Sequence, residues 1–410
     1  MVLQGTANRE KAGERLDLAA WSRLAEQAAA RFGTPCYLSR WLPVERMVET
    51  QERSIGVLPV RSWLSFKTHP VPQLAREWIR SGRGVEVVSE TEFVAVRGLD
   101  CPTAQLLVNG VAKHSWLGRY LAPGLQVHFD SLRETIELLP QAVEQGWRVG
   151  LRCHVPAERD ARDTRYGGQF GMNEADIMEA QRYLQSAGLA VEGLHFHLGQ
   201  IARHPTAYQQ SVAYVVSLCE RLGLTPRYLD CGGGIHHASS PSAAFDDLSS
   251  ALDRAARQLP ALRELWIENG AYITGGSAAL VVRVLDTKDR PDGRYLICDG
   301  GRTNHALDAD NGLHHMLALP TRTGRLVETT VCGPTCMTDD RLGRVTWPAG
   351  IAPGDLVVWL DAGAYHLPWE TRFSHGLTAV VWADALEHLT LARPRETAGQ
   401  WSSGWTTRTA

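Results

Sequence analysis

The residues of this chain that are best able to do chemistry each end a short apolar run. Lys67 ends the run "SWLSFK", His197 the run "GLHFH", and Glu268 the run "LWIE". A lysine amine held in a pocket can act as a nucleophile, and a carboxylate favours the charged form of a nitrogen beside it. A lone lysine at the end of a strand is usually solvated, so this chemistry requires that the three side chains meet.

Three consecutive glycines, Gly232, Gly233 and Gly234, follow another apolar run and suggest an anion site. Because glycine has no side chain, the backbone N–H groups of such a loop can approach an anion closely. A tight turn explains three glycines equally well, so the motif alone does not decide. A phosphate site, a lysine and an acid at the ends of strands together suggest pyridoxal phosphate as the cofactor.

Eight apolar runs alternate with helical stretches, and this alternation must position the polar residues. The runs cover 62–67, 85–89, 105–109, 125–130, 148–154, 193–199, 227–232 and 265–269, and helical spacing occurs at 71–80, 132–145, 174–187, 207–222 and 244–258. This order predicts a (β/α)8 TIM-like barrel, with an open doubly wound sheet as the alternative. Such barrels place their chemistry at the carboxyl ends of the strands, where Lys67, Asn109, Asp130, Arg152 and Glu268 fall.

After Gly270 the pattern changes to strand-like segments separated by Gly, Pro and Asp turns, which predicts a separate β domain. We predict that residues 35–275 form the barrel and that residues 1–34 and 276–410 form a β-sandwich or β-barrel domain. An amphipathic helix is predicted over 16–33, and the strand-like "CYLS" follows it. The sequence leaves open on which domain this N-terminal part packs.

The composition excludes several classes of protein. The chain has 410 residues and a formal net charge of −3, which argues against a strongly basic nucleic-acid surface. No apolar run reaches about 18 residues, so no membrane span is predicted, and the N-terminus has no signal pattern. Eight scattered cysteines without a CxxC pair are interpreted as reduced thiols. We therefore expect a cytoplasmic protein without a nucleic-acid partner.

In their order along the chain, these motifs resemble those of the fold-type III pyridoxal-phosphate decarboxylases, the group of diaminopimelate, ornithine and biosynthetic arginine decarboxylases. The resemblance runs from about Thr34 to His375. It is carried by "SFKTHP", "GVEVVSETE", "NGVAKHSWL", "VHFDS", "LHFHLG", "LDCGGGI", "IENGAY", "CGPTCMTDDRL" and "DAGAYHLPWETRF". Each motif alone is weak, but the ordered set identifies the family and implies an alanine-racemase-like barrel that binds pyridoxal phosphate.

The resemblance implies a role for each matching residue. The implied cofactor contacts are Lys67 as the Schiff-base lysine, Glu86 as a nearby acid, His197 as the stacking ring, Gly232, Gly233 and Gly234 as the phosphate loop, Glu268 as the partner of the pyridine nitrogen, and Tyr365 as a phosphate contact. Cys336 is implied as the catalytic proton donor, which the other subunit of a homodimer with shared active sites supplies. The predicted substrate contacts are Met337, Asp340, Phe373 and Arg152.

No metal site is predicted. His195 and His197 share one face of a strand by the two-residue period, so a metal pair is conceivable, but a third ligand is not evident. The resemblance favours ring stacking for His197, and it leaves His195 as a satisfied core residue.

Three departures from the family pattern bear on the substrate and the phosphate. Met337 stands where decarboxylases of basic or diamino acids have Asp or Glu, and a thioether cannot pair an ammonium group whose burial would be costly. Ala271 replaces the arginine that contacts the phosphate, and Gln169 and Gln200 replace a lysine and a serine. The stretch "QFGM" and the uncharged Met337 resemble a sub-branch of antibiotic biosynthesis, which acts on amino acids tethered to an acyl carrier protein.

We therefore predict a pyridoxal-phosphate-dependent α-decarboxylase of a non-dibasic amino acid, with a glutamyl or aspartyl group on an acyl carrier protein as the leading substrate. The alternatives are a decarboxylase of a free diamino acid of the diaminopimelate or ornithine type, a racemase on the same fold, and a non-catalytic binding protein. Glu268 and the Cys336 motif argue against a racemase. Ala271 alone favours a non-catalytic protein, and the retained Lys67, His197, Glu268 and Cys336 argue against it. Candidate contacts for an acidic carrier protein are Arg80, Arg83 and Arg372, although ordinary solvated charge explains them more simply.

Overall fold

The chain divides into two compact units, and the computed structural model describes residues 17–56, 58–155, 168–199, 206–235, 241–304 and 314–405. Arg46–Tyr272 form the barrel unit, whereas Met1–Glu45 and Ile273–Ala410 form the sheet unit. The predicted boundaries lie at 35 and 275. The first of them differs because residues 36–40 form a strand of the sheet.

The barrel unit contains a closed ring of eight parallel strands. In pairing order they are β2 (Val60–Ser65), β3 (Gly84–Val87), β4 (Leu106–Val108), β5 (Gln126–Phe129), β6 (Arg148–Arg152), β7 (Val191–His195), β8 (Tyr228–Asp230) and β9 (Glu264–Ile267). Each strand overlaps one predicted run, and the pairing of β2 with β9 closes the ring. The predicted (β/α)8 barrel is therefore confirmed, and the open doubly wound sheet is wrong.

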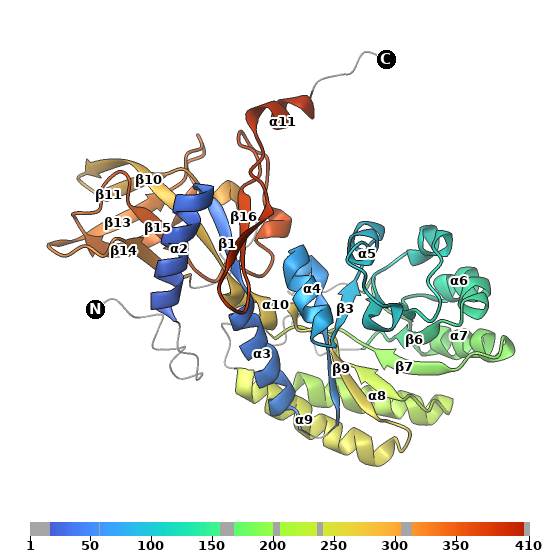
Figure 1. Ribbon diagram of the computed structural model, residues 1–410. Coiled ribbons are helices and arrows are strands. Elements are labelled where there is room, and N and C mark those ends of the chain that lie inside the picture. The colour runs from blue at the N-terminus through green and yellow to red at the C-terminus, as the bar shows by residue number, and fades with distance from the viewer. Residues whose placement is uncertain are drawn as a thin grey trace. The chain divides into compact units, whose positions relative to one another are not determined.

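Helices connect the strands and lie on the outside of the ring (Figure 1). They are α4 (Pro72–Arg80), α5 (Glu90–Arg97), α6 (Leu132–Glu144), α7 (Glu174–Ser186), α8 (Ala207–Leu222) and α9 (Pro241–Gln258), with α3 (Trp41–Ser54) before the barrel and α10 (Gly270–Thr274) after it. Ser89, Ser131 and Asn173 begin three of them, because each side chain accepts an N–H of the first turn that has no partner within the helix.

Aromatic side chains fill the amino-terminal half of the barrel interior. Trp63, Leu107, Tyr228 and Trp266 form one buried cluster, in which the rings of Tyr228 and Trp266 stack with centroids 3.5 Å apart. Gly193 makes room for this layer, since a Cβ there would lie 2.1 Å from the Tyr228 ring. Because inward-facing positions recur every two residues along a strand, the next inward layer carries the polar residues of the site.

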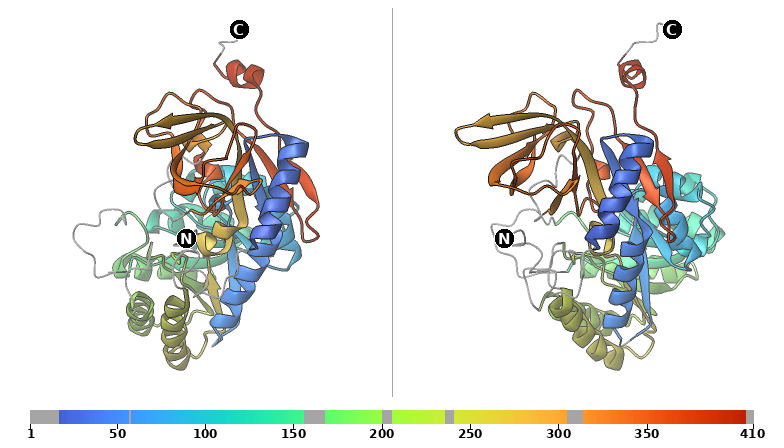
Figure 2. Two further views of the ribbon diagram at one scale, coloured as in Figure 1. Left: turned by 90° about the vertical axis from the view of Figure 1, so that its left-hand side faces the viewer. Right: turned by 60° about the vertical axis from the view of Figure 1, so that its left-hand side comes forward.

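The sheet unit is built on a mixed sheet of nine strands, of which Figure 2 gives two further views. They are β1 (Cys36–Arg40), β10 (Ala278–Arg290), β11 (Gly293–Cys298), β12 (Met316–Leu319), β13 (Leu326–Cys332), β14 (Arg341–Pro348), β15 (Leu356–Trp359), β16 (Ala379–Ala383) and β17 (Leu389–Arg393). The main path runs β14-β13-β11-β10-β1-β16-β17, and β15 pairs with both β10 and β12. The predicted separate β-rich domain is confirmed.

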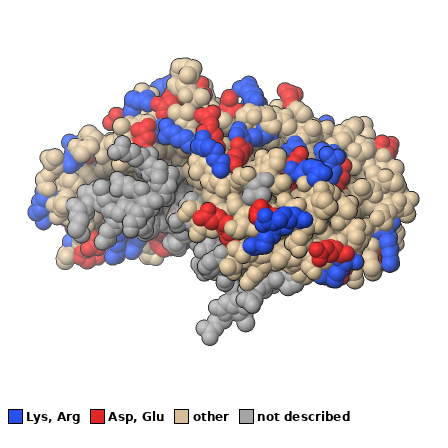
Figure 3. Space-filling view, turned by 90° about the horizontal axis from the view of Figure 1, so that it is seen from below, with Lys and Arg blue, Asp and Glu red and all other residues tan. Residues whose placement is uncertain are grey.

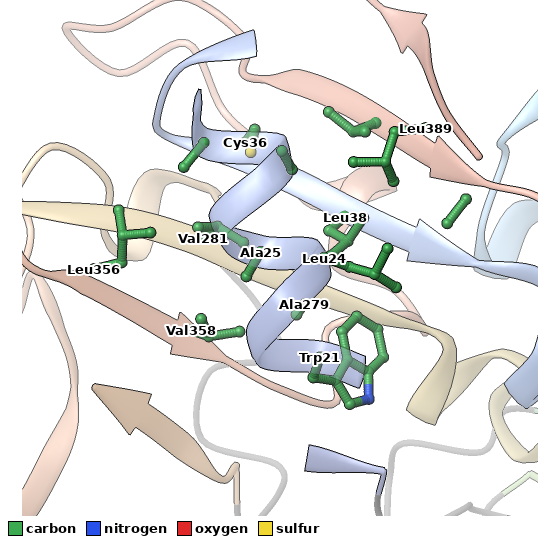
Figure 4. Close-up of a cluster of buried hydrophobic side chains, with 14 of the residues drawn as sticks. Trp21, Leu24, Ala25, Cys36, Leu38, Ala279, Val281, Leu356, Val358 and Leu389 are labelled. Atoms are coloured by element: carbon green, nitrogen blue, oxygen red, sulfur yellow. The ribbon is translucent and has the colours of Figure 1, made fainter. Parts of the chain in front are cut away.

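The N-terminal helix α2 (Leu18–Phe32) packs on this sheet, which answers the question that the sequence left open. Its Trp21 and Leu24 lie in one buried apolar cluster with Leu38 of β1 and Val281 of β10, as Figure 4 shows. Complete burial of such a side chain contributes about 1.5–3 kcal/mol relative to exposure. The core of the sheet unit is therefore apolar, unlike the part of the barrel interior at the carboxyl ends of the strands.

The helices and the cysteines of the described residues bear on the predictions about membrane spans and disulfides. Among the residues that the structure describes, no helix has both the length and the apolar character that a membrane span needs. All eight cysteines lie within the described ranges, and each is a free thiol. Cys332 is partly buried, Cys336 is exposed and the other six are buried, so Cys336 is the most accessible thiol of the eight.

Candidate active site

Lys67 lies at the carboxyl end of the barrel strands, in the 3-10 helix η1 (Phe66–Thr68) that follows β2. Its Nζ lies 2.7 Å from Oε2 of Glu86 on β3, and the Lys67 side chain is 35% exposed whereas Glu86 is buried. The pairing of Ser65 with Glu86 across the two strands brings these side chains together. The amine therefore has a fixed position and an open side, which is what covalent attachment of a carbonyl group needs.

The glycine loop packs closely against the ends of β7 and β9. Gly232 has φ +63°, and a Cβ at Gly233 would lie 2.6 Å from the backbone oxygen of Glu268, so both positions need glycine. The Gly232 amide donates to Oδ1 of Asp230 at 2.9 Å, and the Gly233 amide donates to Nδ1 of His197 at 3.0 Å. The Gly234 amide has no hydrogen-bond partner among the described residues, and it is the free donor of the predicted phosphate loop.

His197 follows β7 at the same end of the barrel, and its ring packs against the glycine loop. Because Nδ1 accepts the Gly233 amide hydrogen, the ring is held in a form that does not carry a proton on that nitrogen. The pKa of His197 is lowered by desolvation first, and then by the positive charges of Arg152 and Lys67. The hydrogen bond and the direction of the pKa shift agree on a neutral ring, as a stacking role requires.

Glu268 is buried directly after β9 and is held at three points. Asn109 Nδ2 donates to its Oε1, Ser65 Oγ donates to its backbone oxygen at 3.2 Å, and its own amide donates to the oxygen of Gly232 at 2.9 Å. The carboxyl group thus has a fixed orientation at the end of the barrel. Asn109 follows β4, and the sequence analysis assigns it no role beyond its place at the end of a strand.

Four buried side chains meet in the barrel interior: His128 on β5, His195 on β7, Asp230 on β8, and Glu268. Each of them contributes one ring nitrogen or carboxyl oxygen, and these four atoms all lie within 4.8 Å of one another. Nε2 of His195 lies 3.8 Å from Glu268 Oε1, and Nδ1 of His128 lies 3.8 Å from Asp230 Oδ2. Neither ring nitrogen of His195 has a hydrogen-bond partner in the described part of the chain, so the prediction that His195 is a satisfied core residue is wrong.

Burial governs the protonation of this cluster. Desolvation first, then the charges of Asp230 and Glu86, raise the pKa of Glu268 well above its usual range. Desolvation also raises the pKa of Asp230 to about 7, and it lowers the pKa values of His128 and His195 well below 6.5. Burial therefore favours the uncharged form of both histidines and of both carboxyl groups in this cluster.

Arg152, a predicted substrate contact, ends β6 at the rim of this cluster. Its Nη1 lies 3.4 Å from Oδ1 of Asp130, and its guanidinium lies 4.6 Å from the centre of the Phe170 ring. Asp130 also accepts the Gly171 amide at 3.1 Å. Arg152 is mostly buried, so it supplies positive charge to the site; its contact with a substrate stays a prediction.

A buried ion pair supports the loop that carries Asn109. Nζ of Lys113 lies 2.7 Å from Oε2 of Glu134 on α6, and both side chains are fully buried. The same amine donates to the oxygen of Gly110 at 2.5 Å, while Glu134 accepts the backbone N–H groups of Lys113 and Asp130. This pair fixes the loop after β4, and through it the amide that holds Glu268.

In the sheet unit, Cys336 and Met337 lie on the loop between β13 and β14. Cys336 is exposed and Met337 is partly buried. Asp340 closes the loop from inside, since its carboxylate accepts the amides of Arg302 and Thr335 at 2.6 and 2.9 Å and the Thr335 hydroxyl at 2.6 Å. Asp340 thus holds the loop in shape, and its predicted contact with a substrate stays a prediction.

The loop between β15 and β16 carries Tyr365, which is partly buried, and Phe373, which is 45% exposed. The 3-10 helix η7 (Arg302–Asn304) joins this loop to that of Cys336. The Thr371 amide donates to the oxygen of Thr303 at 2.8 Å, and the neighbouring Arg302 amide donates to Asp340. The sheet unit therefore brings the loops of Cys336, Met337 and Phe373 together, while their approach to the barrel residues stays a prediction.

The arginines proposed as carrier-protein contacts all have acidic partners within the chain. These pairs are Arg80–Glu77, Arg83–Glu52 and Arg372–Glu396. On the face drawn in Figure 3, basic and acidic side chains are interspersed. Ordinary surface charge therefore remains the simpler explanation. Gln169 is exposed, and Gln200 lies outside the described residues.

Three residues at this end of the barrel have no role predicted from the sequence: Ser65, His128 and Asp230. Each lies two residues before a residue that the sequence does single out, namely Lys67, Asp130 and Gly232. Because inward-facing side chains alternate along a strand, the two-residue period is a signal that could have found all three.

Known proteins resemble this chain over most of its length. The family model described as "Pyridoxal-dependent decarboxylase, pyridoxal binding domain" matches residues 44–275, and "Pyridoxal-dependent decarboxylase, C-terminal sheet domain" matches residues 208–363. A diaminopimelate decarboxylase from Actinosynnema pretiosum subsp. auranticum is 28% identical over 364 residues, which cover 83% of this chain and 82% of that protein. An L-glutamyl-[BtrI acyl-carrier protein] decarboxylase from Niallia circulans is 28% identical over 367 residues, which cover 82% and 85%.

A solved structure shares the fold. The diaminopimelate decarboxylase from Helicobacter pylori complexed with L-lysine aligns with a TM-score of 0.77 at 17% sequence identity. The alignment covers 93% of this chain and 99% of that chain, so both the barrel and the sheet belong to the shared architecture.

Proposed function

Because the chain belongs to the pyridoxal-dependent decarboxylase family, we propose that it removes the α-carboxyl group of an amino acid that has no second basic group. The chain is a carboxy-lyase, and pyridoxal phosphate is its cofactor. The observation that carries the proposal is one arrangement in the barrel. An accessible amine, Lys67, is paired with Glu86 at the end of the strands where Asn109 holds the buried carboxyl group of Glu268.

The residues at this end of the barrel fit the cofactor. Lys67 would attach it covalently, the neutral ring of His197 would face its pyridine ring, and Glu268 would bind the pyridine nitrogen. The free Gly234 amide would donate to the phosphate, with Tyr365 as a second proposed contact. When bound, the cofactor supplies an electron sink for the electron pair that is released as CO2 leaves.

Glu268 determines how well that sink works. An ionised carboxylate beside the pyridine nitrogen favours the protonated nitrogen, and a buried carboxylate without a positive partner would be costly. Its raised pKa therefore means that Glu268 keeps a proton, which it can share with the nitrogen. An arginine at this position would disfavour the protonated ring, so Glu268 supports decarboxylation over racemisation.

Cys336 is our proposed donor for the proton that returns to Cα after CO2 has left. Its thiol is exposed on a loop that Asp340 holds in shape, and a cysteine can act as a general acid. We propose, from the family resemblance, that the donor acts across a homodimer with shared active sites.

Met337 supports a substrate without a distal ammonium group. A thioether offers no negative charge, and an unpaired ammonium group in a closed site would be costly. The Niallia circulans relative is named for an L-glutamyl group on an acyl carrier protein. We therefore propose a glutamyl- or aspartyl-type group on an acyl carrier protein as the substrate.

A free diamino acid is the second candidate substrate. The observation in its favour is that the Actinosynnema pretiosum relative, a diaminopimelate decarboxylase, has the same 28% identity as the carrier-protein enzyme. A free diamino acid would bring a distal ammonium group to Met337, whereas a carrier-bound glutamyl or aspartyl group would not. An assay with both kinds of substrate therefore distinguishes the two candidates.

The deciding experiment is an assay of CO2 release by the purified holoenzyme. The substrates are free lysine, ornithine, diaminopimelate, glutamate and aspartate, together with glutamyl- and aspartyl-acyl carrier protein. We expect kcat/KM for a carrier-bound group to exceed that for the free diamino acids by about tenfold or more. A tenfold ratio corresponds to about 1.4 kcal/mol, and the burial of an unpaired charge costs at least that free energy. A phosphopantetheine-linked glutamate without the protein separates recognition of the acyl group from recognition of the carrier.

Two outcomes would contradict the proposal. Turnover of free lysine, ornithine or diaminopimelate at about 1 per second or more would overturn the interpretation of Met337. Conversion of the L to the D isomer without CO2 release would overturn the decarboxylase and favour the racemase.

A further inference from the structure

Asp230 lies between two parts of the cofactor site, and the proposed reaction does not use it. Its side chain is fully buried at the end of β8. One oxygen, Oδ1, accepts the Gly232 amide of the glycine loop at 2.9 Å. A carboxyl oxygen of Asp230 also lies within 4.8 Å of one from Glu268. A single side chain therefore contacts the loop proposed for the phosphate and lies beside the acid proposed for the pyridine nitrogen.

The second oxygen of Asp230 indicates what lies between the two acids. Two ionised carboxylates have no hydrogen to share, and Oδ2 then has no hydrogen-bond partner among the described residues. Its nearest donor-type atom, Nδ1 of His128, is 3.8 Å away, which is beyond hydrogen-bond range. A buried acceptor of this kind is costly unless it is satisfied. One hydrogen between Asp230 and Glu268 would satisfy it.

Resting on the proposed function, we propose that Asp230 is a positioning residue, which shares one hydrogen with Glu268 through Oδ2 and anchors the glycine loop through Oδ1. Its carboxylate would keep Glu268 basic enough to hold the hydrogen at the pyridine nitrogen. Its bond to Gly232 would keep the loop in the shape that leaves the Gly234 amide free. Asp230 would thus couple the two ends of the cofactor site.

The charged and titratable groups around Glu268 all bear on this coupling. Glu86 on β3 and Asp230 on β8 raise the pKa of Glu268, and Lys67 after β2 lowers it. His128 and His195 face the pair as neutral rings. Arg152 on β6 lowers the pKa of Asp230. Loss of the Asp230 charge should therefore make Glu268 less basic, because it removes one of the two negative charges that act on it.

The test uses the holoenzyme and three variants. Asp230→Asn keeps an oxygen for the Gly232 amide but removes the charge and the shared hydrogen, whereas Asp230→Ala removes both contacts. Asp247→Asn is the matched control, because Asp247 is also buried and accepts a backbone N–H, that of Tyr208 at 3.0 Å, but lies on α9. The measured quantities are the pH midpoint at which the visible absorbance of the bound cofactor changes, and the dissociation constant for pyridoxal phosphate on reconstitution of the cofactor-free protein.

We expect Asp230→Asn to lower the spectral midpoint by about one pH unit, which is typical of the loss of one nearby charge. Its affinity for the cofactor should change little. Asp230→Ala should show the same shift together with about tenfold weaker cofactor binding, because the Gly232 amide loses its acceptor. Asp247→Asn should keep the midpoint and the affinity of the wild type.

Several outcomes would overturn the inference. They are an unchanged midpoint in Asp230→Asn, an equal shift in Asp247→Asn, or a shift that disappears after EDTA treatment, since the last would mean that a metal ion rather than a hydrogen joins the two acids. If both Asp230 variants fail to fold, infrared spectroscopy of the cofactor-free wild type decides: a protonated carboxyl band at pH 6 is expected, and its absence would contradict the shared hydrogen. Failure of the wild type to bind the cofactor would instead contradict the proposed function.

Discussion

Buried acids of the barrel interior and of the sheet unit differ in how completely their oxygens are hydrogen-bonded. In the sheet unit, Asp340 accepts three hydrogen bonds, and Asp355 accepts two from Arg322 and one from the Ala352 amide. In the barrel, buried atoms of His195 and Asp230 have no partner in the described part of the chain. Since an unsatisfied buried polar atom is costly, Asp230 lowers the stability of the barrel in a way that Asp340 and Asp355 do not lower that of the sheet unit.

This contrast indicates that unsatisfied buried groups at the carboxyl ends of the barrel strands mark the candidate site better than surface charge does. The three arginines that the sequence singled out as carrier-protein contacts are all paired with acids on the same chain. Unsatisfied atoms of Asn109, His195 and Asp230 lie at the end of the barrel where Lys67 lies, and other buried atoms without a partner occur elsewhere among the described residues. Real proteins break packing rules where a ligand completes the site, and the following substitutions test whether that is so in this chain.

The largest expected effect separates the two units at once. Lys67→Ala in the barrel should lower kcat for CO2 release by about a thousandfold or more, because covalent attachment of the cofactor is lost. Lys288→Ala on β10 of the sheet unit removes an exposed amine and should leave kcat unchanged. A Lys67→Ala enzyme with kcat within tenfold of the wild type would remove the barrel lysine from the reaction.

The next effect concerns stability. Lys113→Met leaves Glu134 buried without its partner and should lower the free energy of unfolding by about 3–5 kcal/mol, measured by urea denaturation. Leu24→Ala in the apolar cluster of the sheet unit should cost a similar amount, about 2–5 kcal/mol.

The two variants should differ in cofactor binding. Lys113→Met should also weaken it, because the loop that carries Asn109 loses its anchor, whereas Leu24→Ala should not. Equal effects of the two variants on cofactor affinity would mean that the buried ion pair is only structural.

A pH-dependent effect of opposite sign in the two units follows. Desolvation raises the pKa of Asp230 in the folded state from 3.8 to about 7. The folded state therefore binds this proton more tightly than the unfolded chain, and its contribution to stability is lost as the pH rises from about 4 through about 7. The side chain of Asn cannot lose a proton in this range. The free energy of unfolding of Asp230→Asn, relative to that of the cofactor-free wild type, should therefore increase as the pH is raised from 5 to 8.

In the sheet unit the corresponding substitution should lower the free energy of unfolding. Asp340→Asn removes charge-assisted hydrogen bonds and should lower the free energy of unfolding by about 1–3 kcal/mol at pH 8. Urea denaturation at the two pH values measures both variants. A loss of stability in both at pH 8 would show that the barrel acid is satisfied in the same way as the sheet acid.

The smallest expected effect tests the sheet unit as the source of substrate selectivity. Met337→Glu should raise kcat/KM for free lysine or ornithine by about tenfold, because a carboxylate can pair the distal ammonium group. Thr338→Glu, one residue further along the exposed loop, controls for added charge alone. Equal gains in both variants would mean that general attraction, and not position 337, selects the substrate.

The fold could be predicted because its signals are local. Each barrel strand overlaps an apolar run in the sequence, and the polar residues that follow these runs lie together at the carboxyl ends of the strands. The place of β1 could not be predicted in this way, since its pairing with β10 and β16 joins residues more than two hundred positions apart. A five-residue strand carries no local sign of such partners.

The site could be predicted only in its outer layer. Four residues of this layer occupy positions of the sequence motifs, and the structure places them at one end of the barrel: Lys67, Glu86, His197 and Glu268. The inner layer depends on packing: His128 and His195 become neighbours with ring centroids 5.0 Å apart because β5, β6 and β7 pair in a fixed register. Whether a buried atom finds a partner is a property of that packing, and the sequence does not carry it.

Trapping of the cofactor on the chain tests the central claim most directly. Sodium borohydride reduces the bond between a lysine amine and the aldehyde carbon of the cofactor, and peptide mass spectrometry then locates the adduct. We predict that the phosphopyridoxyl group is found on the peptide that contains Lys67 and is absent from the Lys67→Ala enzyme. An adduct on another lysine, such as Lys113 or Lys288, would contradict the account.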